Sequence, residues 1–332
     1  MTLADIDWAV LERLRGLFLS GRAAPHAYWR SPEDLANYDF TYGERIGWKW
    51  DAVLRELDLR GWRPPRGAMS NLEHRRARNE DGKLGVLDWG CGSGVAGRRV
   101  VHWLGVDQVA VLRVWDHSLL AADFAAGAAR AAFPRLAVEP VTPGFLASDE
   151  PVGVLVISHV LHELPAEELR GLRELAARAA AMLWVEPGTS EVSRALIEIR
   201  EQLRGRFRPV APCTHQAGCG LLAPANARHW CHHFAASPSA IFADSNWVRF
   251  GQRAGIDLRS LPFSFLVLER RAAGPEAAGD AGLARVIGEP RAYKGFARVL
   301  SCEADGVREL TLQKRDAPEL FKQLRRPVGP LV

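Results

Sequence analysis

Hydrophobic and polar positions follow two different patterns along the chain, and the change lies near residue 80. Before it, apolar side chains recur at helical spacing, as in Leu11, Leu14 and Phe18. Ser31-Pro32-Glu33 is typical of a helix start, with a capping serine and a proline at the first helical position. We therefore predict a helical N-terminal region over residues 1–80.

From residue 84, short apolar runs alternate with helical stretches, which is the order that produces a parallel, doubly wound α/β sheet. Residues 81–207 are assigned to this core. The expected strands lie at 84–89, 109–115, 136–141, 152–158 and 182–185, and the expected helices at about 118–132, 165–180 and 190–204.

Residues 208–240 interrupt this alternation. They are rich in Cys, His, Pro and Gly without a clear period, so they are expected to form a long ordered loop inserted in the core. Residues 241–332 are expected to complete the core with strands and a hairpin. The strand lies at 263–269, an Ala/Gly linker at 271–282, and the hairpin at 296–302 and 307–313 around Asp305-Gly306.

A glycine-rich turn follows the first expected strand and opens a helix. Its sequence places Asp88 before Gly90, Gly92 and Gly94, in a D-x-G-x-G-x-G pattern. Glycines allow a tight turn and a close approach of the backbone to a ligand at the helix N-terminus. The acidic residue before the first glycine resembles motif I of class I methyltransferases. The turn therefore favours S-adenosylmethionine over a dinucleotide, which is the alternative ligand.

Polar side chains end two neighbouring strands. Asp116 ends the second strand, where a carboxylate can accept hydrogen bonds from ribose hydroxyls; its alternative role is a helix N-cap. Ser158 and His159 follow the fourth strand, which borders the cofactor cleft in this fold, so we add both to the predicted cofactor site. No Asn-Pro-Pro-Tyr-like loop stands there, so no catalytic residue is assigned.

Four of the five cysteines lie late in the chain, at Cys213, Cys219, Cys231 and Cys302. Four thiolates can ligate Zn²⁺ or a [4Fe–4S] cluster. Zinc knuckles favour C-x2-C or C-x4-C pairs, which are absent, so the spacing favours iron–sulfur with zinc as the alternative. The remaining interpretation is four unrelated buried thiols.

The amino-acid composition limits the classes of partner that this protein is expected to have. Hydrophobic residues make up 48% and charged residues 25%, and no apolar run approaches the roughly 20 residues of a membrane helix. Asp5, Asp7 and Glu12 interrupt any leader-like stretch, which favours a cytoplasmic protein without a membrane partner. The net charge is +4, and most of the 43 basic residues are arginine. Arginine suits phosphate contacts and base stacking, so RNA rather than DNA is the expected partner, with codon bias as the alternative explanation.

Several motifs together resemble one family, the methyltransferase-like proteins associated with the small subunit of the mitochondrial ribosome, which include methyltransferase-like protein seventeen and bacterial relatives. The resemblance covers most of the chain. Its motifs are Ala27-Tyr28-Trp29-Arg30-Ser31, Tyr38-Asp39, the glycine-rich turn, Val185-Glu186-Pro187-Gly188-Thr189, the surroundings of the four cysteines, and Arg291-Ala292-Tyr293-Lys294-Gly295.

The resemblance implies a class I methyltransferase fold, a four-cysteine iron–sulfur centre, and a role with the small ribosomal subunit and its rRNA. The family usually has proline after the first two cysteines, whereas Thr214 and Gly220 follow them here. Three functions stay open. They are an RNA methyltransferase, a non-catalytic ribosome-assembly platform, and a small-molecule methyltransferase with a structural zinc.

Overall fold

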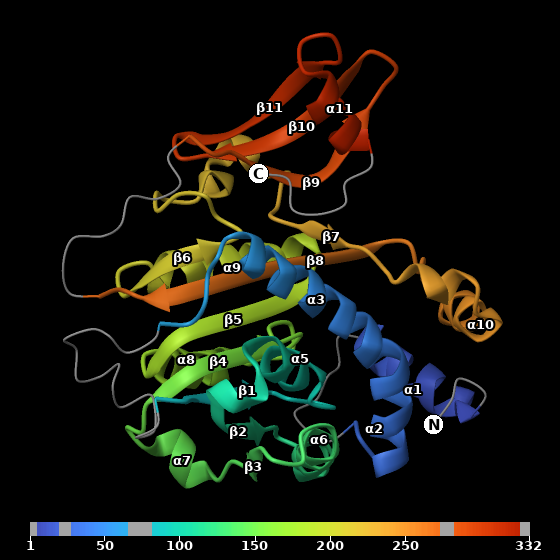
Figure 1. Cartoon of the computed structure of the whole chain (residues 1–332), viewed down its shortest axis with the longest axis vertical. Coiled ribbons are helices and arrows are strands. Elements are labelled where there is room, and N and C mark those ends of the chain that lie inside the picture. Colours follow the sequence, from blue (N-terminus) through green and yellow to red (C-terminus); the bar gives the residue numbers. More distant parts are fainter. Residues whose placement is uncertain (1–4, 20–27, 66–81, 273–281, 326–332) are drawn as a thin grey trace.

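The computed structural model describes residues 5–19, 28–65, 82–272 and 282–325 (Figure 1). A large sheet with strand order β3-β2-β1-β4-β5-β8-β6 forms its centre, and β7 pairs with β8. The strands are β1 (Leu84–Trp89), β2 (Val109–Trp115), β3 (Ala137–Pro140), β4 (Val152–Ser158), β5 (Ala179–Pro187), β6 (Phe207–Ala211), β7 (His233–Ala235) and β8 (Leu261–Arg270).

The direction of the strands identifies the fold. Strands β1 to β5 pair in parallel, and β8 enters antiparallel between β5 and β6. This is the strand arrangement of a class I methyltransferase, so the predicted fold class is confirmed. Strands β1, β2 and β4 have the predicted bounds, and the apolar runs of β1 and β4 are buried on both faces of the parallel sheet.

Helices cover both faces of this sheet. On one face α3 (Glu44–Leu59), α5 (Val95–Leu104), α6 (Leu119–Ala132) and α10 (Ser245–Ala254) share a core with the strands. On the other face lie α8 (Ala166–Ala176) and α9 (Ser190–Leu203), with the short α7 (Pro143–Ala147) at the edge. The remaining N-terminal helices, α1 (Trp8–Leu19) and α2 (Pro32–Tyr38), pack against α6.

The predicted helix start at Ser31 is present. The Ser31 side chain accepts a hydrogen bond from the backbone N–H of Asp34, and Pro32 begins α2. A π-helical segment, Asp39–Gly43, then joins α2 directly to α3. Together these elements form a wall beside the carboxyl ends of β1 and β4 (Figure 1).

The C-terminal part forms a second, three-stranded antiparallel sheet (Figure 1). Its strands are β9 (Arg285–Ala292), β10 (Phe296–Glu303) and β11 (Gly306–Gln313), and α11 (Pro318–Arg325) packs on them. The hairpin is as predicted, but β9 is an addition. The expected loop at 208–240 begins within β6 and contains β7 near its end. Most of the expected linker, 273–281, lies outside the described residues.

Candidate functional site

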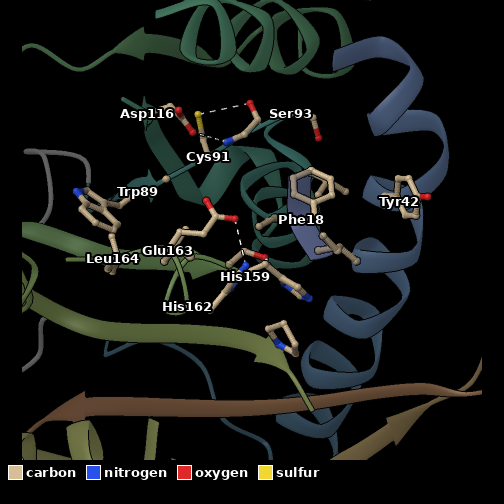
Figure 2. Close-up of a pocket in the computed structure, with 18 of the residues that line it drawn as sticks. Phe18, Tyr42, Trp89, Cys91, Ser93, Asp116, His159, His162, Glu163 and Leu164 are labelled. Carbon is tan, nitrogen blue, oxygen red and sulfur yellow. Dashed lines mark hydrogen bonds and ion pairs between the residues drawn. The ribbon is translucent and has the colours of Figure 1, made fainter. Parts of the chain in front are cut away.

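A cavity of about 660 Å³ opens at the carboxyl ends of β1, β2 and β4 (Figure 2). The strand order reverses between β1 and β4, and ligands of open α/β sheets bind at such a reversal. Figure 2 shows Asp116, Cys91 and Ser93 along one side, with His159, His162 and Glu163 on the facing side and Phe18 and Tyr42 beside them.

The glycine-rich turn forms part of the cavity wall, with different roles for its glycines. Gly90 and Gly92 line the cavity, and both have left-handed backbones, with φ of 70° and 51°. No atom lies within 4 Å of a Cβ placed on Gly92, so the space beside it is open. Gly94 instead faces α6, where its Cβ would stand 2.7 Å from the Cβ of Ala125.

Asp88 lies behind the turn and not in the cavity wall. It is fully buried, and its Oδ2 accepts a hydrogen bond of 2.9 Å from the backbone N–H of Gly97 in α5. Burial raises the pKa of its carboxyl to about 7. Asp88 thus ties the end of β1 to the helix that follows the turn.

Asp116 faces the cavity at the end of β2. Its two oxygens accept 2.9 Å hydrogen bonds from the backbone N–H groups of Gly92 and Ser118, so it fixes the turn in place. The helix cap of α6 is Ser118 and not Asp116. Each carboxylate oxygen has a second lone pair, which leaves Asp116 able to accept a ribose hydroxyl. Burial raises the pKa of Asp116 as well.

The turn after β4 brings Ser158 and His159 to the same cavity. His159 has a φ of 56°, which makes it the one non-glycine residue with a left-handed backbone among the described residues. Glu186 holds this turn, since its Oε1 accepts from the backbone N–H groups of Val160 and Leu161 at 3.1 Å each. Burial raises the pKa of Glu186 to about 7.

Lys49, which the sequence analysis did not single out, reaches the cavity from α3. Its Nζ lies 3.1 Å from Nε2 of His159, whose Nδ1 lies 3.2 Å from Oγ of Ser158. The indole N–H of Trp50 donates to the same Ser158 oxygen at 3.0 Å. The signal in the sequence was a lysine between two tryptophans on a helix whose apolar face is buried.

The four late cysteines line a second, separate cavity of about 40 Å³. Cys213, Cys219 and Cys231 come from the 208–240 segment and Cys302 from β10, so the topology joins residues that are far apart in sequence. Cys91 is absent from its lining. Among the described residues, no group of three or more His, Cys, Asp or Glu side chains is spaced to hold a metal ion.

Hydrogen-bond donors surround these sulfurs. Arg200 donates from Nε to the Cys213 sulfur at 3.3 Å. The Arg285 guanidinium lies 3.2 Å from Nδ1 of His233, and because a guanidinium only donates, His233 carries its proton on Nε2, 3.6 Å from the Cys231 sulfur. Burial raises the pKa of Cys231 well above its usual value and that of Cys302 to about 12. Sequence reasoning had not found either arginine.

A family model described as "Mitochondrial small ribosomal subunit Rsm22" matches residues 133–328, more than half of the chain. The chain belongs to the Rsm22 family. The match includes the strand end at Glu186 and all four late cysteines, so the predicted family is confirmed. No curated protein matches this Rsm22-family chain.

Several solved structures are similar to it in overall arrangement. Magnesium protoporphyrin IX methyltransferase from Synechocystis, with bound SAH, has 12% identity and a TM-score of 0.38, covering 80% of this chain and all of that chain. The N-methyltransferase NodS from Bradyrhizobium japonicum has 12% identity and a TM-score of 0.35, covering 67% of this chain and all of its own. TrmK from M. capricolum has 8% identity and a TM-score of 0.33, covering 63% of this chain and 72% of TrmK.

None of the described helices is long and apolar enough to cross a membrane.

Proposed function

We propose that this chain binds S-adenosylmethionine in the 660 Å³ cavity and acts as a methyltransferase on RNA of the small ribosomal subunit. The observation that carries the proposal is the convergence of Gly90, Gly92 and Asp116 with Ser158 and His159 at the reversal of strand order. The turn offers backbone close to the ligand, and Asp116 offers an acceptor for ribose. Membership of a family described from a ribosomal subunit supports the RNA partner.

The enclosed cavity suits methyl transfer, which requires alignment of the reactants and exclusion of water. The sulfonium of the cofactor is already activated, so the protein mainly aligns the methyl group with the nucleophile and excludes water. Residues from two regions enclose the cavity, the N-terminal helices and the ends of the sheet strands.

The cytoplasmic location remains a prediction, because the family is described from a mitochondrial ribosomal subunit.

We also propose that Cys213, Cys219, Cys231 and Cys302 hold a [4Fe–4S] cluster, with Zn²⁺ as the alternative. The chemistry of the donors supports this proposal, since all four are sulfur, line one cavity, and receive hydrogen bonds or contacts from Arg200 and His233, although the described residues are not spaced around a metal ion. Two buried guanidiniums would offset the negative charge of four thiolates. A bound centre supplies a cross-link between the 208–240 segment and β10.

Calorimetry with S-adenosylmethionine tests the cofactor site. The wild type is expected to bind, and Gly92→Arg is expected to lose binding, because its side chain fills the open space of the cavity from a left-handed backbone. The matched control is Gly127→Arg, on an exposed part of α6 with nothing within 4 Å of its Cβ. Equal binding by the wild type and Gly92→Arg would place the cofactor elsewhere.

Tritiated methyl transfer to immature small subunits tests the activity. Label in rRNA supports the proposed reaction, and label in a metabolite extract supports a small-molecule substrate instead. If the protein binds the cofactor and co-sediments with small subunits but labels nothing, the assembly-platform function is correct. Iron and acid-labile sulfide, at about four of each per chain after anaerobic purification, would identify the cluster. One zinc per chain without iron would reject it.

A further inference from the structure

Lys49 lies in an unusual setting for a lysine. It is partly buried in the cavity wall, and within the part of the chain that the structure describes it forms no ion pair. Its polar contact is the His159 ring, at 3.1 Å. A structural lysine usually extends its amine into water or pairs with a carboxylate, whereas this one is directed at the site where a ligand binds.

The hydrogen-bond chain behind Lys49 fixes its orientation. Lysine has donors and no acceptor while it is charged, so Nε2 of His159 accepts from it. Nδ1 of His159 then carries the proton and donates to Ser158, whose oxygen also accepts from Trp50. When the amine is neutral, it still donates one N–H to His159 and keeps a lone pair for a second partner.

The backbone of His159 adopts an energetically unfavourable conformation in this arrangement. A left-handed φ of 56° is uncommon for a residue with a side chain, and such residues cluster at functional sites. Glu186 holds the following turn through two backbone N–H groups. The fold therefore maintains a strained conformation that presents the His159 ring to Lys49.

We propose that Lys49 accepts the proton released by the nucleophile during methyl transfer, with His159 as its positioning residue. The inference rests on the proposed function. The nucleophile, an N–H nitrogen, attacks the methyl carbon, and a new N–CH₃ bond forms as the C–S bond breaks. The bonding pair goes to sulfur and gives S-adenosylhomocysteine. The proton of the nitrogen moves to the lone pair of Lys49 Nζ and later to solvent.

The lining of the cavity indicates the shape of the substrate. Aromatic side chains from the N-terminal region line the cavity that Lys49 enters, and they contact one another mostly edge to face, so they give that side of the cavity an aromatic wall suited to a flat ring. The structure thus favours a nucleobase with an exocyclic amino group or ring N–H. These aromatic residues are Phe18, Tyr28, Trp29, Tyr38 and Tyr42.

The charges around Lys49 support a neutral amine near physiological pH. The pKa of Lys49 is lowered to about 7, mainly by burial and also by the charge of Arg45 on the same helix, while Glu186 from β5 acts in the opposite direction. Burial holds the pKa of His159 well below its usual value, and Lys49, His162 and Arg45 add to this, so the ring stays neutral. Lys49 is then a proton acceptor above about pH 7.

The test uses the full chain, S-adenosylmethionine and immature small subunits. Lys49→Met removes the acceptor and keeps the bulk, and Lys294→Met on the small sheet is the matched control. We expect Lys49→Met to lower methyl transfer at pH 8 at least about 100-fold. It should also abolish the rise of the wild-type rate with pH through about 7, while thermal melting and cofactor binding stay close to wild type.

His159→Asn tests the positioning role, because asparagine tolerates a left-handed backbone. It should move the midpoint of the pH profile, whereas a purely structural role would lower the rate without moving it. Transfer by Lys49→Met within about threefold of wild type, or an unchanged pH profile, would overturn the inference. A wild type that binds cofactor but labels no RNA also overturns it and leaves cofactor binding intact. A wild type that binds no cofactor overturns the proposed function itself.

Discussion

Asp88 illustrates how a motif residue can act from behind the site it helps to form. Its carboxyl is enclosed between β1 and α5, accepts from Gly97, and leaves Oδ1 without a partner among the described residues. A charge in that position is costly, which is why the pKa of the group rises to about 7. Asp88 therefore acts on the proposed cofactor site only indirectly, through the position of the glycine-rich turn.

The raised pKa of Asp88 makes stability depend on pH. Its pKa in the unfolded chain is about 3.9, so the folded state holds the proton more tightly. The stability this contributes is fully present below about pH 4 and is lost as the pH rises through about 7. Asp88→Asn keeps an oxygen for Gly97 and cannot ionise.

Urea unfolding between pH 4 and pH 8 measures this effect. The free energy of unfolding of Asp88→Asn should fall less steeply with pH than that of the wild type. The slope is not abolished, because the pKa of Glu186 is also raised to about 7, and Glu186→Gln should remove that part. Identical slopes in the wild type and both variants would mean that these carboxyls titrate normally.

Single residues show where sequence reasoning stopped. Gly90, Gly92, Asp116, Ser158 and His159 were predicted from strand ends and glycines, and the structure brings all five to one cavity. Lys49 was not found, because its role depends on the approach of α3 to the turn after β4, a contact between residues 110 positions apart. Local patterns carry no information on such a contact.

At the scale of elements, two helices reach both candidate sites, α9, which lines both cavities, and α3. Near the middle of α3, Lys49 and Trp50 contact the turn after β4. At its end, Arg60 donates to the backbone oxygens of Val210, Pro212 and Cys213 at 3.0 to 3.3 Å. One helix therefore positions both the cofactor cavity and the first cysteine.

A buried ion pair anchors the end of α3. Glu56 lies 2.5 Å from Arg285 and 2.9 Å from Arg60, and the Glu56 and Arg285 side chains are only 5% and 4% exposed. Glu56→Gln would leave the Arg285 charge buried without its partner, so the free energy of unfolding should fall by about 3–5 kcal/mol. Denaturant unfolding would show it.

The control is Glu12→Gln, which removes an exposed ion pair with Arg253 and should change stability far less. Equal losses for the two variants would show that the buried pair has no special role. Equal stability of Glu56→Gln and wild type would show that water reaches Arg285.

The periodicity of hydrophobic residues predicted some elements and missed others. Buried strands such as β4 are continuous apolar runs, and their bounds were predicted. Strand β9 was missed because Gly288 and Pro290 interrupt it and because one of its two buried positions is occupied by Arg285, so its sequence lacks an apolar alternation. Helix α10 was not predicted, although its buried residues Trp247, Phe250, Gly251 and Ala254 follow the spacing of a helix.

At the scale of the whole molecule, the cysteine cavity lies where the 208–240 segment meets the small sheet. Gly220 packs so closely on the hairpin turn that its Cβ would stand 2.9 Å from Cα of Gly306. Cys302 brings a sulfur from β10 to the three cysteines of that segment. A metal centre there would join the small sheet to the large one.

The two cavities draw on different parts of the chain, which predicts that they can be separated. The lining of the cofactor cavity runs from Phe18 to Val192, whereas all four cysteines come later. Cys302→Ser should therefore lose iron and expose the 208–240 segment to limited proteolysis, while the affinity for S-adenosylmethionine stays within about threefold of wild type. Metal analysis, protease digestion and calorimetry measure the three effects.

Cys91→Ser is the matched variant, because Cys91 lines the cofactor cavity and not the cysteine cavity. It should keep wild-type iron and wild-type protease resistance. If Cys302→Ser instead lost cofactor binding together with iron, the coupling would have to pass through α3 or through α9, the two helices that reach both sites. Coupling through α3 would make Glu56→Gln weaken cofactor binding as well, because that change breaks the anchor at the cysteine end of α3, whereas coupling through α9 would leave cofactor binding by Glu56→Gln unchanged.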